Sequence, residues 1–148
     1  MVILKYIATI GIIGYFPLAP GTFSSLIALA LFILLKPTPL IHIIILLIIT
    51  PLSIFSSHYA EKLFNSKDSK HIVIDEFCGY FISVFLTPFS YAFSAFILFR
   101  VFDILKPFPI RKIEYILEGG VGIVADDIMA ALYTNIILQI WKLFYYNP

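Results

Sequence analysis

The longest apolar run in the chain extends from Leu40 to about Tyr59 and is broken only by Pro51 and a few polar residues. A membrane-spanning helix needs about 20 apolar residues, so this run is long enough to cross a lipid bilayer. Pro51 lies inside the run and predicts a kink, because proline removes one backbone hydrogen bond of the helix. The composition agrees, since the 148 residues are 61% hydrophobic and only 13% charged. We therefore expect an integral membrane protein with a single domain over residues 1–148.

The charge balance and the cysteine count exclude several classes of function. A net charge of +1 provides no basic field for nucleic acid, so no nucleic-acid partner is expected. The single cysteine, Cys78, excludes an internal disulfide and a cysteine metal cluster. Residues 1–14 are apolar but too short to span a bilayer, and no signal-cleavage site precedes the turn at Pro17. We expect this segment to be retained, at the interface or packed on the bundle.

The apolar stretches predict an all-α, polytopic membrane bundle of about five hydrophobic helices, preceded by the short N-terminal segment. The first of these helices is expected from about Thr22 to Leu35, with Thr22 or Ser24 as its cap. The polar and basic residues 60–72 predict a loop, which the positive-inside rule places on the cytoplasmic side.

The second half of the chain contains two shorter signals before its last helix. Residues 111–118 predict a short amphipathic surface helix, and the glycines of residues 119–122 predict a flexible turn. Asp126 and Asp127 are then expected at the start of a final apolar helix that ends near Tyr146.

Residues 77–99 create a topology problem. A single crossing would place the basic loop 100–118 on the side opposite the basic loop 60–72, although both are expected to be cytoplasmic. Pro88, in the middle of the run, predicts two short helices at about 77–87 and 89–104. Each is too short for a full span, so the hairpin 77–104 is expected to be re-entrant or to thin the bilayer locally.

This hairpin returns the chain to one membrane face and gathers five acidic residues there: Asp75, Glu76, Asp103, Asp126 and Asp127. Charges in such apolar surroundings are costly unless they are paired, bound to a metal or used in function. Five carboxylates that converge without a cation would also repel one another. An all-oxygen ligand set fits Mg²⁺, with Mn²⁺ as a possible substitute.

Basic residues close to these acids indicate that the site also binds a phosphate. Arg100 and Asp103 are three residues apart and share a helix face, and Lys106 extends that face if the helix persists. Asp103 could then bind the metal while Arg100 and Lys106 bind a phosphate. The glycine- and hydroxyl-rich loop 14–25, before a helix N-terminus, is a further candidate for anion binding.

The signatures of three known classes of phosphatase do not occur in the chain. A cysteine phosphatase needs an arginine six residues after its cysteine, but Val84 stands there after Cys78. No Asp-x-Asp pattern occurs, and none of the three histidines lies in a Pro-Ser-Gly-His-like stretch. With these classes eliminated, hydrolysis of a phosphate ester would have to be assisted by a metal ion.

Four segments follow one another along the chain: Pro17-Leu-Ala-Pro-Gly-Thr22, Ile74-Asp-Glu-Phe77, Phe99-Arg-Val-Phe-Asp-Ile-Leu-Lys-Pro-Phe-Pro-Ile110 and Gly119-Gly-Val-Gly-Ile-Val-Ala-Asp-Asp-Ile128. In this order they resemble the phosphatidylglycerophosphatase A family, although Ser24 stands where that family usually has glycine. The resemblance implies an all-α, Mg²⁺-dependent enzyme of the bacterial inner membrane. Its substrate would be phosphatidylglycerophosphate, from which it would remove the terminal phosphate.

The resemblance also implies roles for particular residues. The metal and acid–base set would be Asp75, Glu76, Asp103, Asp126 and Asp127, and the phosphate contacts would be Thr22, Arg100 and Lys106. A carboxylate that does not bind the metal, Asp127 or Glu76, would accept a proton from water, while Lys106 would stabilise the charged oxygens. A covalent aspartyl-phosphate and a Thr22 nucleophile remain alternatives.

Two other classes of function compete with this interpretation. A small ion transporter or channel component could also place acidic residues within the membrane. A purely structural membrane subunit would leave the acidic pairs without a role. The acids cluster at helix ends with basic partners, which favours the phosphatase, and release of phosphate from a lipid would distinguish it from both. The sequence indicates no oligomeric state.

Overall fold

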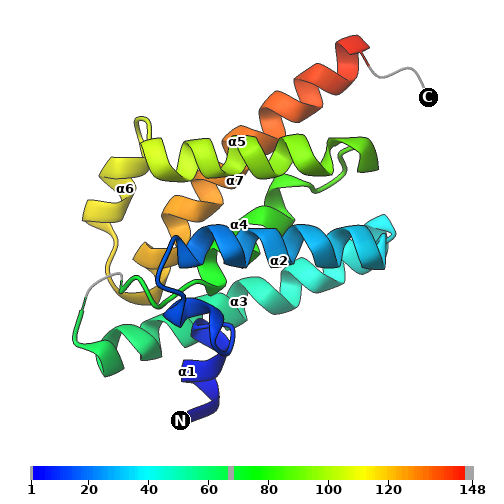
Figure 1. Ribbon diagram of the computed structural model, residues 1–148. Helices are drawn as coiled ribbons and strands as arrows, with labels where there is room; N and C mark the ends of the chain where they lie inside the picture. The colour runs from blue at the N-terminus through cyan, green and yellow to red at the C-terminus, as the bar shows by residue number, and fades with distance from the viewer. Residues whose placement is uncertain (1, 67–68, 146–148) are drawn as a thin grey trace.

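The computed structural model describes residues 2–66 and 69–145, without the side chains of Glu114 and Tyr115. Within these ranges the chain is helical and contains no β-strand, which confirms the all-α prediction (Figure 1). The α-helices are α1 (Val2–Ala8), α2 (Pro20–Leu35), α3 (Pro39–Phe64), α4 (Ile74–Ser83), α5 (Ala92–Leu105), α6 (Ile110–Ile116) and α7 (Gly119–Tyr145), with 3₁₀ turns η1 (Ile13–Tyr15) and η2 (Phe89–Tyr91).

Two helices, α3 and α7, are long and apolar enough to cross a bilayer. Only 22% of the most apolar window of α3 is buried inside the bundle. Its outward face carries Leu40, Leu47 and Phe55, each about 70% exposed. Such an apolar surface is stable in lipid rather than in water, so these helices indicate membrane association. The predicted count of about five hydrophobic membrane helices is not confirmed, because no other described helix reaches this length.

The first turn of α2 differs from the prediction. The helix begins at Pro20 instead of Thr22, because proline fits the first helical position, where its missing N–H is not needed. Neither Thr22 nor Ser24 caps it, since the N-cap residue is Ala19. The Ser24 hydroxyl instead donates a hydrogen bond to the carbonyl oxygen of Val73 at 2.5 Å. This bond ties α2 to the chain just before α4.

Helix α3 continues beyond its predicted end near residue 59 and ends at Phe64, so residues 60–64 are helical rather than part of a loop. Ala60 is fully buried in a small core with Ala8 of α1, and this packing stabilises the additional turn. The helix is closed by Asn65 in the left-handed conformation, which asparagine tolerates well. Residues 67–68 of the predicted loop lie outside the described ranges.

The predicted break near Pro88 is confirmed, since α4 and α5 are separate helices. Three side chains of α7, Asn135, Gln139 and Lys142, donate hydrogen bonds to carbonyl oxygens in the break. Asn135 Nδ2 lies 3.1 Å from the Ser83 oxygen and 2.8 Å from the Phe85 oxygen. Carbonyl groups that lose their helical partners need others in an apolar environment, and α7 supplies them.

The glycines of residues 119–122 form the first turn of α7, not the flexible turn that the sequence predicts. A Cβ atom on Gly120 would lie only 2.6 Å from the backbone nitrogen of His58 in α3. Glycine is therefore needed for close packing of the two long helices rather than for a change in chain direction. As a consequence, Asp126 and Asp127 lie inside α7 and not at its beginning.

Helix α4 occupies the centre of the arrangement, where it contacts α2, α3, α5 and α7 (Figure 1). Its aromatic residues Tyr80 and Phe81 are fully or almost fully buried, as is Phe99 of α5. The N-terminal turn of α4, which carries an acidic pair, is thereby held in the interior of the bundle.

Candidate metal and phosphate site

Three carboxylates from two helices lie together inside the bundle. Asp75 and Glu76 belong to the first turn of α4, and Asp127 belongs to α7. One carboxylate oxygen from each lies within 4.8 Å of the other two. Asp75 and Asp127 retain only 5% and 2% of their accessible surface. Three negative charges this close repel strongly, so the arrangement favours protonation, neighbouring cations or a bound metal ion.

Gly79, one turn after the acidic pair of α4, allows α4 to approach α5 and α7 closely. A Cβ atom on Gly79 of α4 would lie 2.6 Å from the Phe99 ring of α5 and 3.3 Å from Cβ of Asp127 in α7. Any larger residue at position 79 would push these helices apart. The approach of α4 to α7 at Gly79 is what brings Asp127 next to Asp75 and Glu76.

Two basic side chains neighbour this acidic cluster, and each pairs with a further acid. Arg100 Nη1 lies 2.5 Å from Oδ2 of Asp103 and 4.0 Å from Oε1 of Glu76. Lys106 Nζ lies 2.6 Å from Oδ2 of Asp126. The site thus consists of three clustered carboxylates with two ion pairs beside them.

The position of Lys106 depends on how α5 ends. The helix stops at Leu105, and Lys106 is its C-cap residue in the left-handed conformation, so the helical stripe predicted from Arg100 does not reach it. Pro107 explains the stop, because a proline disfavours the helical conformation of the residue before it. The turn directs the lysine side chain to Asp126 of α7 rather than along the face of α5.

Burial is the main reason why the pKa of Glu76 rises to about 7. A hydrogen bond with Asp75 and the charge of Arg100 lower this pKa, whereas the charge of Asp103 raises it. The Oε2 atom of Glu76 is buried and has no hydrogen-bond donor among the described residues. An oxygen in this situation is suited to bind a cation.

The donor set indicates the kind of ion that would fit. Asp75, Glu76 and Asp127 offer only carboxylate oxygens, and no histidine or cysteine belongs to this group. Hard divalent cations prefer such oxygen ligands, whereas zinc and copper favour nitrogen and sulfur. The neighbouring cations of Arg100 and Lys106 would suit the oxygens of a phosphate group.

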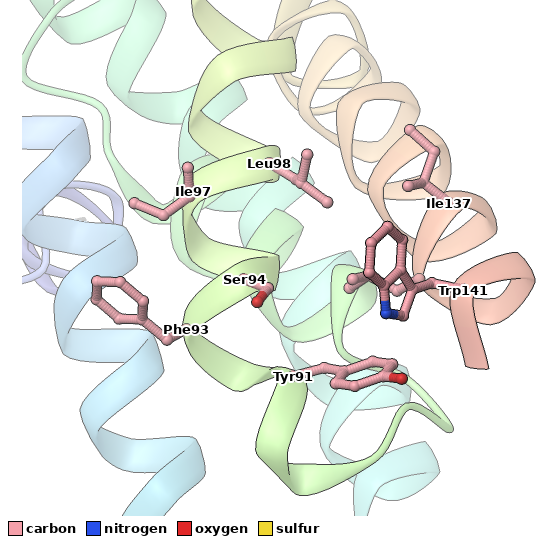
Figure 2. A pocket seen from close by; sticks show the side chains of 8 residues that line it. Tyr91, Phe93, Ser94, Ile97, Leu98, Ile137 and Trp141 are labelled. Carbon is pink, nitrogen blue, oxygen red and sulfur yellow. The ribbon is translucent and has the colours of Figure 1, made fainter. Parts of the chain in front are cut away.

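A separate groove of about 450 Å³ lies between α5 and the C-terminal half of α7 (Figure 2). Ile97 and Leu98 face it from α5, and Ile137 and Trp141 face it from α7. Its lining contains no acidic or basic side chain. This groove can therefore accommodate apolar groups, but the clustered carboxylates and the two ion pairs lie outside its lining.

Comparison with known proteins assigns the family. Residues 6–142 match the sequence profile of phosphatidylglycerophosphatase A. The chain belongs to the phosphatidylglycerophosphatase A family. The resemblance predicted from the four sequence segments is thus confirmed, and membership in a lipid phosphatase family does not favour the ion-transporter alternative.

Curated relatives of this phosphatidylglycerophosphatase A family member cover most of its length. Phosphatidylglycerophosphatase A of Haemophilus influenzae is 40% identical over 135 residues, which cover 84% of this chain and 82% of the relative. The Escherichia coli protein of that name is 33% identical over 130 residues, 84% of this chain and 75% of the relative. A putative phosphatidylinositol-3-phosphatase of Bacteroides thetaiotaomicron is 35% identical over 138 residues, 86% of both chains. No solved structure matches the chain.

The predicted site residues fall into three groups in this family member. The acidic cluster contains Asp75, Glu76 and Asp127, and two ion pairs contain Arg100 with Asp103 and Lys106 with Asp126. Thr22 is partly exposed in the first turn of α2 and makes no side-chain hydrogen bond to the described residues.

Sequence reasoning missed a contact next to Thr22. A Cβ atom on Gly21 would lie 2.7 Å from Cδ of Glu76 and 3.4 Å from Nη1 of Arg100. The Pro-Gly-Thr segment therefore reaches the site through the backbone of Gly21. Gly21 belongs to the Pro17–Thr22 segment that carries the family resemblance, but no pattern in the sequence indicates its contact with Glu76.

Proposed function

We propose that this chain is a Mg²⁺-dependent phosphatase that removes the terminal phosphate monoester of phosphatidylglycerophosphate. The products are phosphatidylglycerol and inorganic phosphate. The observation that carries the proposal is the convergence of Asp75, Glu76 and Asp127 beside two basic side chains, Arg100 and Lys106. Membership of the family, whose curated relatives include two phosphatidylglycerophosphatases, supports the substrate.

In this proposal the Mg²⁺ ion is held by Asp75 and by whichever of Glu76 and Asp127 does not act as the base. Asp103 is a further ligand predicted from the sequence, whereas Asp126, which the sequence also predicts as a ligand, pairs with Lys106. When bound, Mg²⁺ supplies Lewis-acid stabilisation of the phosphate oxygens and promotes ionisation of water. The carboxylate set fits this ion because all its donor atoms are oxygens.

The side chains of the protein then have separate tasks. Arg100 and Lys106 bind the terminal phosphate and stabilise the charge that develops on its oxygens, with Thr22 as a further phosphate contact. Glu76 or Asp127 accepts a proton as the oxygen of water bonds to phosphorus. The bond between phosphorus and the glycerol oxygen breaks, and that oxygen receives the proton.

We place the enzyme in the bacterial inner membrane as a multi-pass protein with its site at the cytoplasmic face. The exposed apolar face of α3 supports a lipid environment. The basic residues at the end of α3 and in α6 support a cytoplasmic position for the ends of the helices that carry the site.

A related lipid is the second candidate substrate, because the Bacteroides relative is named a putative phosphatidylinositol-3-phosphatase. Phosphatidylinositol 3-phosphate resembles phosphatidylglycerophosphate in one respect. Both lipids carry a phosphate monoester in addition to the phosphodiester that joins the head group to diacylglycerol.

The test is phosphate release by the purified protein in detergent, with phosphatidylglycerophosphate, phosphatidylinositol 3-phosphate and phosphatidic acid as substrates. We expect phosphatidylglycerophosphate to be hydrolysed fastest, and only when Mg²⁺ is present. Preferential hydrolysis of the inositol lipid would select the second candidate. Absence of phosphate release from all three lipids with Mg²⁺ would contradict the phosphatase proposal.

A further inference from the structure

A concave surface of about 550 Å³ lies where α5 ends and α6 begins. It is formed by three cations and three apolar side chains: Leu105, Lys106, Phe108, Arg111, Lys112 and Ile116. It differs from the apolar groove between α5 and α7, because half of its lining residues are basic.

The two cations of α6 are available to a ligand. Arg111 and Lys112 are exposed, and neither forms an ion pair with any side chain in the described part of the chain. Nothing in the proposed hydrolysis requires them, since that reaction uses Arg100 and Lys106. Two adjacent exposed cations in a concave surface are complementary to an anion such as a phosphate.

Lys106 connects this surface to the acidic site. Its side chain lines the concave surface, while its Nζ atom lies 2.6 Å from Oδ2 of Asp126, the residue next to Asp127. A molecule in contact with Lys106 can therefore extend from the acidic cluster on one side to Arg111 and Lys112 on the other.

The apolar part of the surface indicates what kind of anion fits. Phe108 is 81% exposed, and Leu105 and Ile116 are 64% and 63% exposed. Exposed apolar side chains beside lysine and arginine are typical of segments that lie at the interface between lipid head groups and acyl chains. The expected ligand thus combines a phosphate with apolar chains.

We infer that Arg111 and Lys112 bind the internal phosphodiester of the lipid substrate while its terminal phosphate lies at the acidic site. This inference rests on the proposed function. Phosphatidylglycerophosphate has two phosphates separated by a three-carbon glycerol unit, and phosphatidylinositol 3-phosphate has two separated by the inositol ring. Phosphatidic acid has a monoester but no phosphodiester head group, so this surface distinguishes it from the two candidate substrates.

The test compares the double variant Arg111→Gln/Lys112→Gln with the wild-type protein on phosphatidylglycerophosphate and phosphatidic acid, in micelles of an uncharged detergent. Loss of two charge-assisted phosphate contacts should lower kcat/KM for phosphatidylglycerophosphate about tenfold or more. The kcat/KM for phosphatidic acid should change less than about twofold, since that lipid has no phosphodiester to lose. Circular dichroism checks that the helices are retained.

The matched control is Lys62→Gln/Lys70→Gln, which removes two exposed positive charges outside this surface. It should leave both substrates unaffected. An equal loss on both lipids, or an equal loss in the control, would show general attraction to anionic lipid and overturn the inference. Unchanged efficiency in the double variant, or no wild-type preference between the lipids, would also overturn it. An inactive wild-type protein would instead overturn the proposed function and this inference with it.

Discussion

Gly21 of α2 lies directly against the carboxyl group of Glu76 in α4, although 55 residues separate them in the sequence. A Cβ atom at position 21 would come within 2.7 Å of Cδ of Glu76. No other residue type leaves this space to the carboxyl group. The backbone of α2 thus forms one wall of the acidic cluster.

Gly21→Ala should therefore displace the Glu76 carboxyl group and reduce phosphate release about tenfold or more, as expected when a catalytic group is misplaced. Alanine is the better helix former by about 1 kcal/mol, so the helix itself should not be weakened. The measurements are phosphate release across Mg²⁺ concentrations and thermal unfolding followed by circular dichroism. Unchanged turnover and unchanged Mg²⁺ dependence would contradict the proposed contribution of Glu76.

Cys78 should be a packing residue. It is fully buried in α4, and its Sγ atom lies 3.4 Å from the hydroxyl oxygen of Thr50. Serine fits the same space and can hydrogen-bond the same partner, so Cys78→Ser should keep near-wild-type phosphate release. Thiol reagents should likewise have little effect on the folded enzyme, because the sulfur is not accessible. Inactivation by the substitution in a folded protein would point to a role for the thiol in the reaction.

The approximate extents of most helices were predictable because they depend on local signals. Apolar runs, the break near Pro88 and adjacent acids at positions 75–76 and 126–127 are all visible in the sequence. Close contacts between helices were not predictable in the same way. The sequence predicts that Gly120 is part of a turn, yet in the structure it allows α7 to pack on His58. Glycine is common both in turns and at close contacts between helices, and only the three-dimensional neighbours of the residue show which of the two applies.

The division of the acids into a cluster and two ion pairs also depended on tertiary structure. Asp126 and Asp127 are neighbours in the sequence but point about 100° apart on a helix. One consequently meets Lys106 and the other meets the acids of α4. The conformation of Lys106, which ends α5 before Pro107, decides which acid the lysine reaches.

Asn135 should stabilise the break between α4 and α5. Its side chain donates hydrogen bonds to the carbonyl oxygens of Ser83 and Phe85. Asn135→Leu leaves these acceptors without that donor, which should cost about 1–3 kcal/mol of unfolding free energy. Thermal or denaturant unfolding in detergent measures the loss. Lys142→Met is a suitable comparison, because it removes one exposed hydrogen bond, to Leu86, and should cost less.

The predicted topology places two basic segments on the same side of the membrane. Lys70 precedes α4 and Lys112 belongs to α6, and in the hairpin interpretation both face the cytoplasm. Single cysteines at these positions in a Cys78→Ser background should react with an impermeant thiol reagent only after the cells are opened. Labelling of the two positions from opposite sides of the membrane would contradict the hairpin interpretation and the proposed cytoplasmic site.

The two adjacent aspartates of α7 should have different roles. Asp127 lies with Asp75 and Glu76, so Asp127→Asn should abolish phosphate release and weaken Mg²⁺ binding, because a hard cation requires the carboxylate charge. Asp126 lies 2.6 Å from Lys106, so Asp126→Asn should mainly disturb the position of the lysine.

Lys106→Ala provides the comparison that separates these roles. Loss of one charge-stabilising donor should lower kcat on the order of 100-fold without changing the Mg²⁺ concentration needed for half-maximal activity. Asp126→Asn should resemble Lys106→Ala.

Asp103→Asn tests whether Asp103, the partner of Arg100, also binds the metal, as the sequence predicts. We expect Asp103→Asn to lose almost all phosphate release, and any residual activity to need a higher Mg²⁺ concentration. The measurements are phosphate release over a range of Mg²⁺ concentrations and circular dichroism of each variant. Near-wild-type turnover in Asp127→Asn would refute the metal site, and a shifted Mg²⁺ requirement in Lys106→Ala would refute the separation of metal and phosphate binding.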